Sequence, residues 1–306
     1  MSVFRGTAAY AAQPLDGATI TIGNFDGVHR GHRHLIAVAR ERPGPTVALT
    51  FDPAPRDVLR PDHGIPRIQT LEDRVRCLLE QGVDAVVVEP FTRALGAMAP
   101  EVFAHDLLMG RLAPSALVLG YDFRFGHKRA GTVETLASWV DVPVLQVEAL
   151  TDAQGPVSSS RIREAVQRGD LSEASRLLER PHELRGTVLH GDARGRTLGF
   201  PTANIDPRTA LRPPHGVYAV RAAVAGPGEP AWMDGVANWG IRPMWETQRP
   251  LLEVHLLDRT LDLYDQDLRV QLVAHLRPEE RFDGQDALVA AIRHDVEAAR
   301  EVLEAR

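Results

Sequence analysis

The chain has 306 residues, a length that favours two domains, each large enough to bury its own core. Hydrophobic residues make up 44% of it and charged residues 25%, which is ordinary for a globular protein. The formal charge of −6 argues against a general nucleic-acid binder, because such proteins usually carry a basic face. A single cysteine, Cys77, excludes a disulfide framework or a cysteine zinc site, and we expect it to pack in a helix.

The N-terminus lacks a basic segment followed by an apolar one, and no apolar run reaches membrane-spanning length. We therefore expect a cytoplasmic protein without a membrane partner. The sequence leaves the oligomeric state open.

Short β-rich runs alternate with helical segments up to about residue 150. The expected strands are Ala18–Gly23, Val47–Phe51, Ala85–Glu89, Leu117–Gly120 and Val142–Val147. The expected helices lie near His32–Arg42, Leu71–Gln81, Pro100–Leu112 and Val133–Val140. Continuous apolar strands separated by helices predict a doubly wound α/β domain, with a parallel sheet covered on both faces. In such sheets ligands bind beyond the carboxyl ends of the strands.

The second half has a different texture. Two short helices, Ser160–Arg168 and Leu171–Leu178, precede Arg180–Arg185, which we interpret as a connector between domains 1–180 and 186–306. Short strands punctuated by glycine and proline then predict an antiparallel β-barrel; they are Gly186–Leu189, Gly216–Val224, Met233–Ala237, Leu251–Leu257 and Leu268–Leu276. A terminal helix follows, with Asp283 as candidate N-cap and one apolar packing stripe of Leu288, Ile292, Val296, Ala299 and Leu303.

The segment Thr21–His34, TIGNFDGVHRGHRH, carries the densest chemistry of the first half. An apolar run ends at Gly23, an FDG turn follows, and His29 and His32 open a helix. The first turn of a helix offers unpaired N–H groups and positive potential, and Gly31 allows a ligand to approach the backbone. This order predicts a nucleotide-phosphate site, although an isolated HxGH could equally be surface histidines at a helix cap.

Three further loops are expected at the same sheet edge: TFDPAP after the second strand, GYDFRFGHKRAG after the fourth, and SSSRIR before a helix. Serine hydroxyls, helix N–H groups and arginine side chains together suit a triphosphate. Each loop alone also has a structural explanation, since serines often cap helices and Phe123 and Phe125 could belong to the core.

In the second half, Gly186–Asn204 (GTVLHGDARGRTLGFPTAN) combines glycines that can wrap phosphates with arginines that add charge. Gly191, Gly195 and Arg196 are the candidate phosphate-binding residues. The hydroxyl of Thr202 and the amide oxygen of Asn204 are hard donors that suit Mg²⁺. Taken alone, PTAN would usually be a turn.

Taken together, GNFDGVHRGH, GYDFRFG and SSSRIR resemble the adenylyltransferase module of the bacterial bifunctional riboflavin kinase/FAD synthetases. The resemblance implies that His29 and His32 contact ATP at the α-phosphate, with Gly23, Phe25 and Gly31 also on the ATP side. It places Ser159, Ser160 and Arg163 at the departing pyrophosphate. It implies that Asp122 and Phe125 line the FMN side, with Phe125 against the flavin ring.

GRTLGFPTANI similarly resembles the riboflavin kinase motif of this family. Phosphoryl transfer to a hydroxyl needs a proton acceptor. Glu253, in LLEVHLLD, matches the family's catalytic glutamate, although an acidic residue among apolar neighbours could simply face solvent. The resemblance implies that Mg²⁺ is held partly by Thr202 and Asn204.

Three positions depart from the family pattern: Ala54 replaces a histidine, Met244 a threonine and Asp265 a glycine. We expect the histidine to be dispensable. We expect the fold to survive at Asp265, because aspartate tolerates left-handed turns.

The resemblance thus predicts an enzyme that makes FMN from riboflavin and ATP, and then FAD from FMN and ATP. Two alternatives stay open at this point: a nucleotidyltransferase for another phosphorylated acceptor, and a flavin-binding regulatory protein with decayed catalysis.

Overall fold

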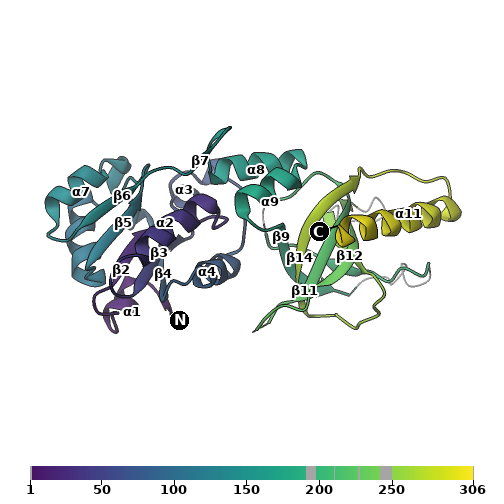
Figure 1. The fold of residues 1–306 in the computed structure, drawn as a ribbon, viewed down its shortest axis with the longest axis horizontal. Helices are drawn as coiled ribbons and strands as arrows, with labels where there is room; N and C mark the ends of the chain where they lie inside the picture. Colours follow the sequence, from purple (N-terminus) through teal and green to yellow (C-terminus); the bar gives the residue numbers. More distant parts are fainter. Residues whose placement is uncertain (1, 191–197, 210, 227, 242–249, 306) are drawn as a thin grey trace. The chain divides into compact units, whose positions relative to one another are not determined.

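The computed structural model describes residues 2–190, 198–209, 211–226, 228–241 and 250–305. The chain divides into two compact units, traced in Figure 1. The first unit comprises Met1–Pro66 and Leu71–Ser159, and the second comprises Arg67–Thr70 and Ser160–Arg306. The predicted limits of the functional domains, 1–180 and 186–306, stay a prediction.

The first unit is built on a six-stranded parallel sheet with strand order β1-β4-β3-β2-β5-β6. Its strands are β1 (Ser2–Arg5), β2 (Thr19–Ile22), β3 (Thr46–Asp52), β4 (Ala85–Pro90), β5 (Ala116–Gly120) and β6 (Val144–Val147). This confirms the predicted doubly wound fold. A two-stranded hairpin, β7 (Thr151–Asp152) and β8 (Gly155–Pro156), follows.

Helices cover both faces of this sheet, because alternate residues of its buried strands are apolar on each side. The helices described in this unit include α1 (Thr7–Ala11), α2 (Arg30–Arg40), α3 (Pro55–Leu59), α4 (Leu71–Glu80), α5 (Arg93–Gly96), α6 (Pro100–Val102), α7 (Val133–Trp139) and the short turns η1 (Pro61–His63) and η3 (His127–Arg129). Cys77 lies in one of the two cores at 2% exposure, which confirms that it is a packing residue.

Two features of the first unit differ from the sequence prediction. The edge strand β1 and helix α1 were not predicted, since four residues with Val3 exposed carry no continuous apolar signal. The expected helix Pro100–Leu112 is α6 followed by a π-helix, η2 (Phe103–Leu112), in which the Ala113 N–H donates to the Leu108 carbonyl five residues back.

The second unit contains a closed six-stranded antiparallel barrel with strand order β10-β13-β12-β11-β14-β9, as predicted. Its strands are β9 (His182–Leu189), β10 (Ala203–Ile205), β11 (Gly216–Val224), β12 (Met233–Ile241), β13 (Pro250–Leu256) and β14 (Asp267–Arg277). Two helices precede it, α8 (Ser159–Arg168) and α9 (Leu171–Leu178), and α11 (Gln285–Glu304) ends the chain.

Side chains of the barrel alternate between the interior and the outer face. The interior holds a core that includes Tyr218, Trp239, Leu252 and Val254. On the outer face, Ala299 and Leu303 of α11 pack against a second apolar cluster, with Val296 beside them. The other two residues of the predicted stripe, Leu288 and Ile292, are half-buried. The predicted N-cap is wrong, because Gly284 rather than Asp283 occupies that position, at φ 101°.

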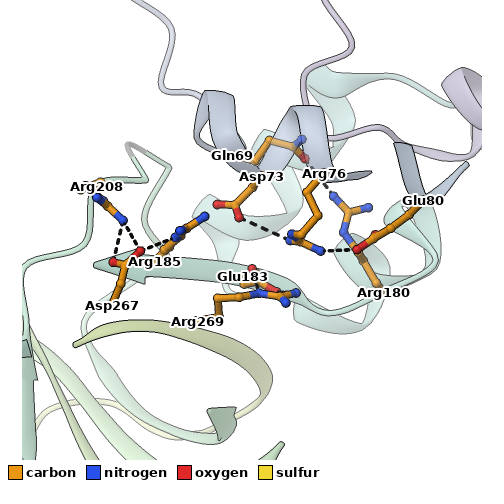
Figure 2. Close-up of polar contacts among 10 residues, drawn as sticks. All are labelled: Gln69, Asp73, Arg76, Glu80, Arg180, Glu183, Arg185, Arg208, Asp267 and Arg269. Atoms are coloured by element: carbon orange, nitrogen blue, oxygen red, sulfur yellow. Dashed lines mark hydrogen bonds and ion pairs between the residues drawn. The ribbon is translucent and has the colours of Figure 1, made fainter. Parts of the chain in front are cut away.

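The prediction that Arg180–Arg185 is a connector is also wrong. Residues from His182 onward belong to β9 and pair with β14. Charged side chains alternate here with buried apolar ones and form ion pairs across the two strands, which Figure 2 shows. Glu183 accepts two hydrogen bonds from Arg269, at 2.8 and 3.0 Å, and Arg185 donates to Asp267 at 2.7 Å. The charged residues of this segment therefore belong to a paired strand rather than to a linker.

A short segment from the first half of the sequence, Arg67–Thr70, belongs to the second unit. The Leu211 N–H donates to the Arg67 carbonyl at 2.9 Å. Arg180 donates to the Gln69 side-chain oxygen, also at 2.9 Å (Figure 2). Nothing in the local sequence pattern distinguishes these four residues, and only the fold reveals their place.

The buried His182 leads to a prediction about the stability of the second unit in acid. Its ring is 1% exposed and bonds the Leu211 carbonyl at 3.4 Å, and burial lowers its pKa from 6.5 to about 4. An unfolded chain therefore binds a proton below pH 6.5 that the folded unit resists until about pH 4. We predict that the free energy of unfolding falls across this window, by on the order of 3 kcal/mol in full.

The measurement is the urea midpoint of the second unit between pH 7 and pH 4.5. His182→Gln should reduce its pH dependence, whereas the same change at the exposed His294 of α11 should not. Equal pH dependence in the wild type and His182→Gln would contradict this account.

Candidate active sites

The turn between β2 and α2 brings the two predicted histidines together. His29 is the N-cap of α2, which confirms the expected helix start. The His29 and His32 rings are stacked, with centroids 3.7 Å apart. Gly31 makes room for this stack, because a Cβ there would lie 3.2 Å from Cε1 of His29. The N–H groups of the first helical turn and two imidazoles thus share one corner of the unit.

Burial lowers the pKa of His32 well below its usual 6.5, and the neighbouring His29 lowers it further. His32 is therefore neutral near pH 7. Its Nδ1 atom is inaccessible to solvent and has no hydrogen-bond partner among the residues that the structure describes. The edge of Phe25 lies against the same ring, with centroids 5.3 Å apart.

Neighbouring elements hold the turn through its carbonyl groups. The Thr50 hydroxyl, near the end of β3, donates to the Asn24 carbonyl at 3.2 Å. The Ser159 hydroxyl donates to the Asp26 carbonyl at 2.8 Å. In this arrangement the single hydroxyl proton of Ser159 supports the turn, and its role at the departing pyrophosphate stays a prediction.

Two predicted ligand-facing aromatic residues lie in the core instead. The Phe25 side chain is fully buried in the core beneath α2, so only its backbone can face ATP. Phe125 is 5% exposed and packs among Phe103, Phe123 and Trp139, with ring centroids 5.5 to 6.3 Å apart. The ring is therefore a core side chain in this structure, and its contact with a flavin ring stays a prediction from the resemblance.

The other residues predicted for this site are found as follows. Gly23 lies directly after β2, where a Cβ would meet the Phe25 ring at 3.2 Å. Asp122 is exposed just beyond the end of β5. Ser160 and Arg163 lie in the first turns of α8, within the second unit. Ala54, where the family pattern has histidine, is 3% exposed at the start of α3.

In the barrel, strand pairing brings together the residues predicted for phosphoryl transfer. Asn204 of β10 lies directly opposite Glu253 of β13, and Glu253 lies opposite Asn238 of β12 on its other side. The flanking Leu252 and Val254 face the barrel interior, so Glu253 faces outward.

The same alternation puts both asparagines on that outer face, because Ile205, Ala237 and Trp239 belong to the interior. Directly opposed residues on one face have Cβ atoms about 4.5–5.5 Å apart. A carboxylate therefore stands between two amides. Asn204 is only 7% exposed although it faces outward.

Thr202 directly precedes β10, and the segment before it is held by a residue that the sequence analysis did not identify. Nδ1 of His255 lies 2.8 Å from the Pro201 carbonyl, and its ring packs against Phe200. The sequence alone does not distinguish His255 and Asn238 from other strand residues, because both simply alternate with apolar neighbours. Their importance becomes visible only when the strand register is known.

Five further positions of the second unit were predicted to matter. Gly191, Gly195, Arg196 and Met244 lie outside the described residues. Asp265 is described and adopts a left-handed conformation at φ 61°, with its N–H donating to the Val188 carbonyl. This confirms that the fold tolerates aspartate there.

A parallel α/β sheet with paired histidines at a helix start, together with a barrel that sets a carboxylate between two amides, defines a two-unit transferase that acts on nucleotide phosphates. Comparisons with known proteins identify the family within this class of transferases. A family model described as FAD synthetase matches residues 12–161, and one described as riboflavin kinase matches residues 178–303.

Three curated relatives carry the name bifunctional riboflavin kinase/FMN adenylyltransferase. The Escherichia coli K12 protein is 38% identical, with 98% of this chain and 97% of that protein covered. The Bacillus subtilis protein is 35% identical, with 92% and 91% covered, and the Pseudomonas fluorescens protein is 38% identical, with 93% and 92% covered. A crystal structure described as a macrolide-efflux protein from Streptococcus pneumoniae has a TM-score of 0.85 at 29% identity, with 98% of both chains covered.

The chain belongs to the family of bifunctional riboflavin kinase/FMN adenylyltransferases. It phosphorylates riboflavin to FMN and adenylylates FMN to FAD, with ATP as the donor in both steps. Within the described residues, no helix is both long and apolar enough to cross a membrane.

The contact between Gly31 and the His29 ring leads to a prediction. Gly31→Ala adds a Cβ 3.2 Å from that ring and 3.3 Å from the Val157 carbonyl, so the stack must shift. We expect FAD formation from FMN to fall by ~10-fold or more, since small misplacements of binding groups are costly.

Riboflavin phosphorylation should be unchanged, and alanine is the better helix former, so thermal stability should not explain the loss. Gly226→Ala, whose Cβ would meet nothing within 4 Å, serves as the control. Full FAD formation by Gly31→Ala would show that the stack does not matter.

Proposed function

We propose that the two activities reside in two separate sets of residues, one at the start of α2 and one on the outer face of the barrel. The stacked His29 and His32 support the first set, and the direct opposition of Asn204 and Glu253 supports the second. The strand register is the observation that supports the proposal most strongly. It places the candidate base Glu253 opposite the candidate oxygen donor Asn204, although the two residues are about 50 positions apart in sequence.

In the adenylylation step, an FMN phosphate oxygen attacks the α-phosphorus of ATP. A new P–O bond forms, the bond to the β-phosphate breaks, and pyrophosphate leaves. We propose that His29, His32 and the first amides of α2 stabilise the charge that develops on the α-phosphate. No covalent intermediate with the protein is required. The roles of Ser159, Ser160 and Arg163 at the departing pyrophosphate, and of Asp122 on the flavin side, stay predictions from the sequence motifs alone.

In the kinase step, the ribityl hydroxyl attacks the γ-phosphorus of ATP and ADP leaves. We propose that Glu253 accepts the hydroxyl proton as the new P–O bond forms. Its half-buried position on the outer face leaves the carboxylate reachable for a substrate. Gly191, Gly195 and Arg196 are proposed phosphate-binding residues on the sequence motif alone.

The residues beside Glu253 fit a magnesium ion. Asn204, directly opposite the Glu253 carboxylate, offers an amide oxygen, and Thr202, two residues earlier, offers a hydroxyl; both are hard donors. The low exposure of the Asn204 amide on a polar outer face agrees with a buried ligand role. Mg²⁺ bound there would neutralise phosphate charge and orient the γ-phosphate. A cytoplasmic location stays a prediction from the sequence.

Glu253→Gln tests the kinase assignment. It keeps the side-chain volume and removes the proton acceptor, so FMN formation from riboflavin should fall by ~100-fold or more. FAD formation from supplied FMN should persist. Asp234→Asn, which removes an exposed carboxylate from the same barrel, is the matched control and should retain both activities. Normal FMN formation by Glu253→Gln would exclude Glu253 as the base.

His29→Ala tests the adenylylation assignment. With riboflavin as the sole flavin, FMN should accumulate and FAD should not. His34→Ala, an exposed histidine on the same helix, should behave as the wild type. Chromatography of the flavins over time measures both products. Loss of FMN formation together with FAD formation would contradict two independent sites.

A further inference from the structure

The turn that presents His29 has a strained backbone. Phe25 and Val28 adopt φ angles of 48° and 40°, in the left-handed region that disfavours residues with a side chain. A β-branched residue such as Val28 is a clear outlier there. Strained conformations of this kind persist only where surrounding structure holds them, and they concentrate at functional sites. Since Val28 directly precedes His29, whatever holds this turn also sets where the imidazole lies.

Arg74 of α4 contacts this turn and the end of β3 through several hydrogen bonds. Its guanidinium is buried, with the residue 5% exposed. Nη1 donates to the Asn24 carbonyl at 2.9 Å and to the Phe51 carbonyl at 3.2 Å, and lies 3.4 Å from the Thr50 hydroxyl. Nη2 donates to Oδ1 of Asp52 at 3.3 Å. One side chain therefore joins the start of the turn to the end of β3.

We propose that Arg74 is a positioning residue for FMN adenylylation, acting through the turn rather than on the substrate. Its guanidinium holds the Asn24 carbonyl, which keeps the strained segment up to Val28 in place and sets the His29–His32 stack at the start of α2. This inference rests on the proposed contact of that stack with the ATP phosphates.

Only arginine suits these contacts. Its planar group offers several N–H donors in fixed directions and stays charged when buried, so it can bond three acceptors at once. A lysine would keep the charge but offers one compact ammonium group on a flexible stem. Arg74→Lys should therefore leave the turn incompletely held while retaining the salt bridge to Asp52.

The test compares Arg74→Lys with Arg76→Lys, a control on the same helix. Arg76 pairs with Asp73 at 3.4 Å and Glu80 at 2.8 Å, as Figure 2 shows. We expect Arg74→Lys to lower kcat for FAD formation by ~10-fold or more, with KM for FMN little changed. Riboflavin phosphorylation should be unaffected in both variants. Arg76→Lys should retain full FAD formation.

A spectroscopic readout separates positioning from mere stability. In protein labelled with ¹³C-histidine, the imidazole signals of His29 and His32 should move in Arg74→Lys, because the ring stack is disturbed, and stay fixed in Arg76→Lys. If Arg74→Lys unfolds the first unit, Thr50→Val takes its place as the test of whether the hold on the turn positions the histidines. It is nearly isosteric, removes one hydrogen bond to Asn24, and should give the same shifts with a smaller loss, ~3-fold, of FAD formation.

If Arg74→Lys folds, unchanged FAD formation and unchanged imidazole signals in that variant would overturn the inference. If Arg74→Lys unfolds, the same result in Thr50→Val would overturn it. His29→Ala in parallel shows which idea fails. If His29→Ala keeps full FAD formation, the proposed site itself is wrong. If His29→Ala abolishes it while Arg74→Lys folds and is fully active, only the role of Arg74 is wrong.

Discussion

Strand pairing is the constraint on which both candidate sites depend. In the closed barrel, the strand register determines which face a side chain occupies and which residues lie opposite it on the two adjacent strands. The observed register places Glu253 opposite Asn204 and Asn238. A slip of one residue would turn Glu253 into the apolar interior and bring Leu252 or Val254 to the outer face. The large buried core of Tyr218, Trp239 and its neighbours opposes such a slip, and in this way packing energy secures the geometry of the polar face.

The same constraint acts in the parallel sheet, through the ends of strands rather than their faces. β2 and β3 are neighbours, so their carboxyl ends meet, and the turn after β2 lies beside Thr50 and Phe51 of β3. The sheet thereby supplies the hydrogen-bond donors and acceptors around a turn that is unfavourable by itself. The free energy needed to hold Phe25 and Val28 at positive φ comes from burying both side chains and from the bonds to the Asn24 and Asp26 carbonyls.

Much of the fold followed from the sequence, because the apolar runs of the parallel sheet and the spaced strands of the barrel have clear periodicity. The strand from Gly216 to Val224 and the helix from Leu171 to Leu178 were predicted with the observed bounds. Weak or mixed patterns failed, as in the exposed edge strand β1 and in β9, where charged residues that pair across strands resembled a linker.

The motifs predicted local structure where it is simple, as at the helix start, where His29 is the N-cap. The burial of Phe25 and Phe125 could not be predicted, since an aromatic ring in a ligand motif and one in a core look alike in sequence. Arg74 and Asn238 could not be found at all, because their importance arises from neighbours distant in the chain.

We propose that one chain carries two independent sites, joined only by FMN as product of one and substrate of the other. The most direct test mixes two single variants, Glu253→Gln and His29→Ala, with riboflavin, ATP and Mg²⁺. Each variant alone should make little FAD from riboflavin, whereas the mixture should make FAD at a rate approaching that of the wild type. A mixture that makes no more FAD than either variant alone would contradict the claim.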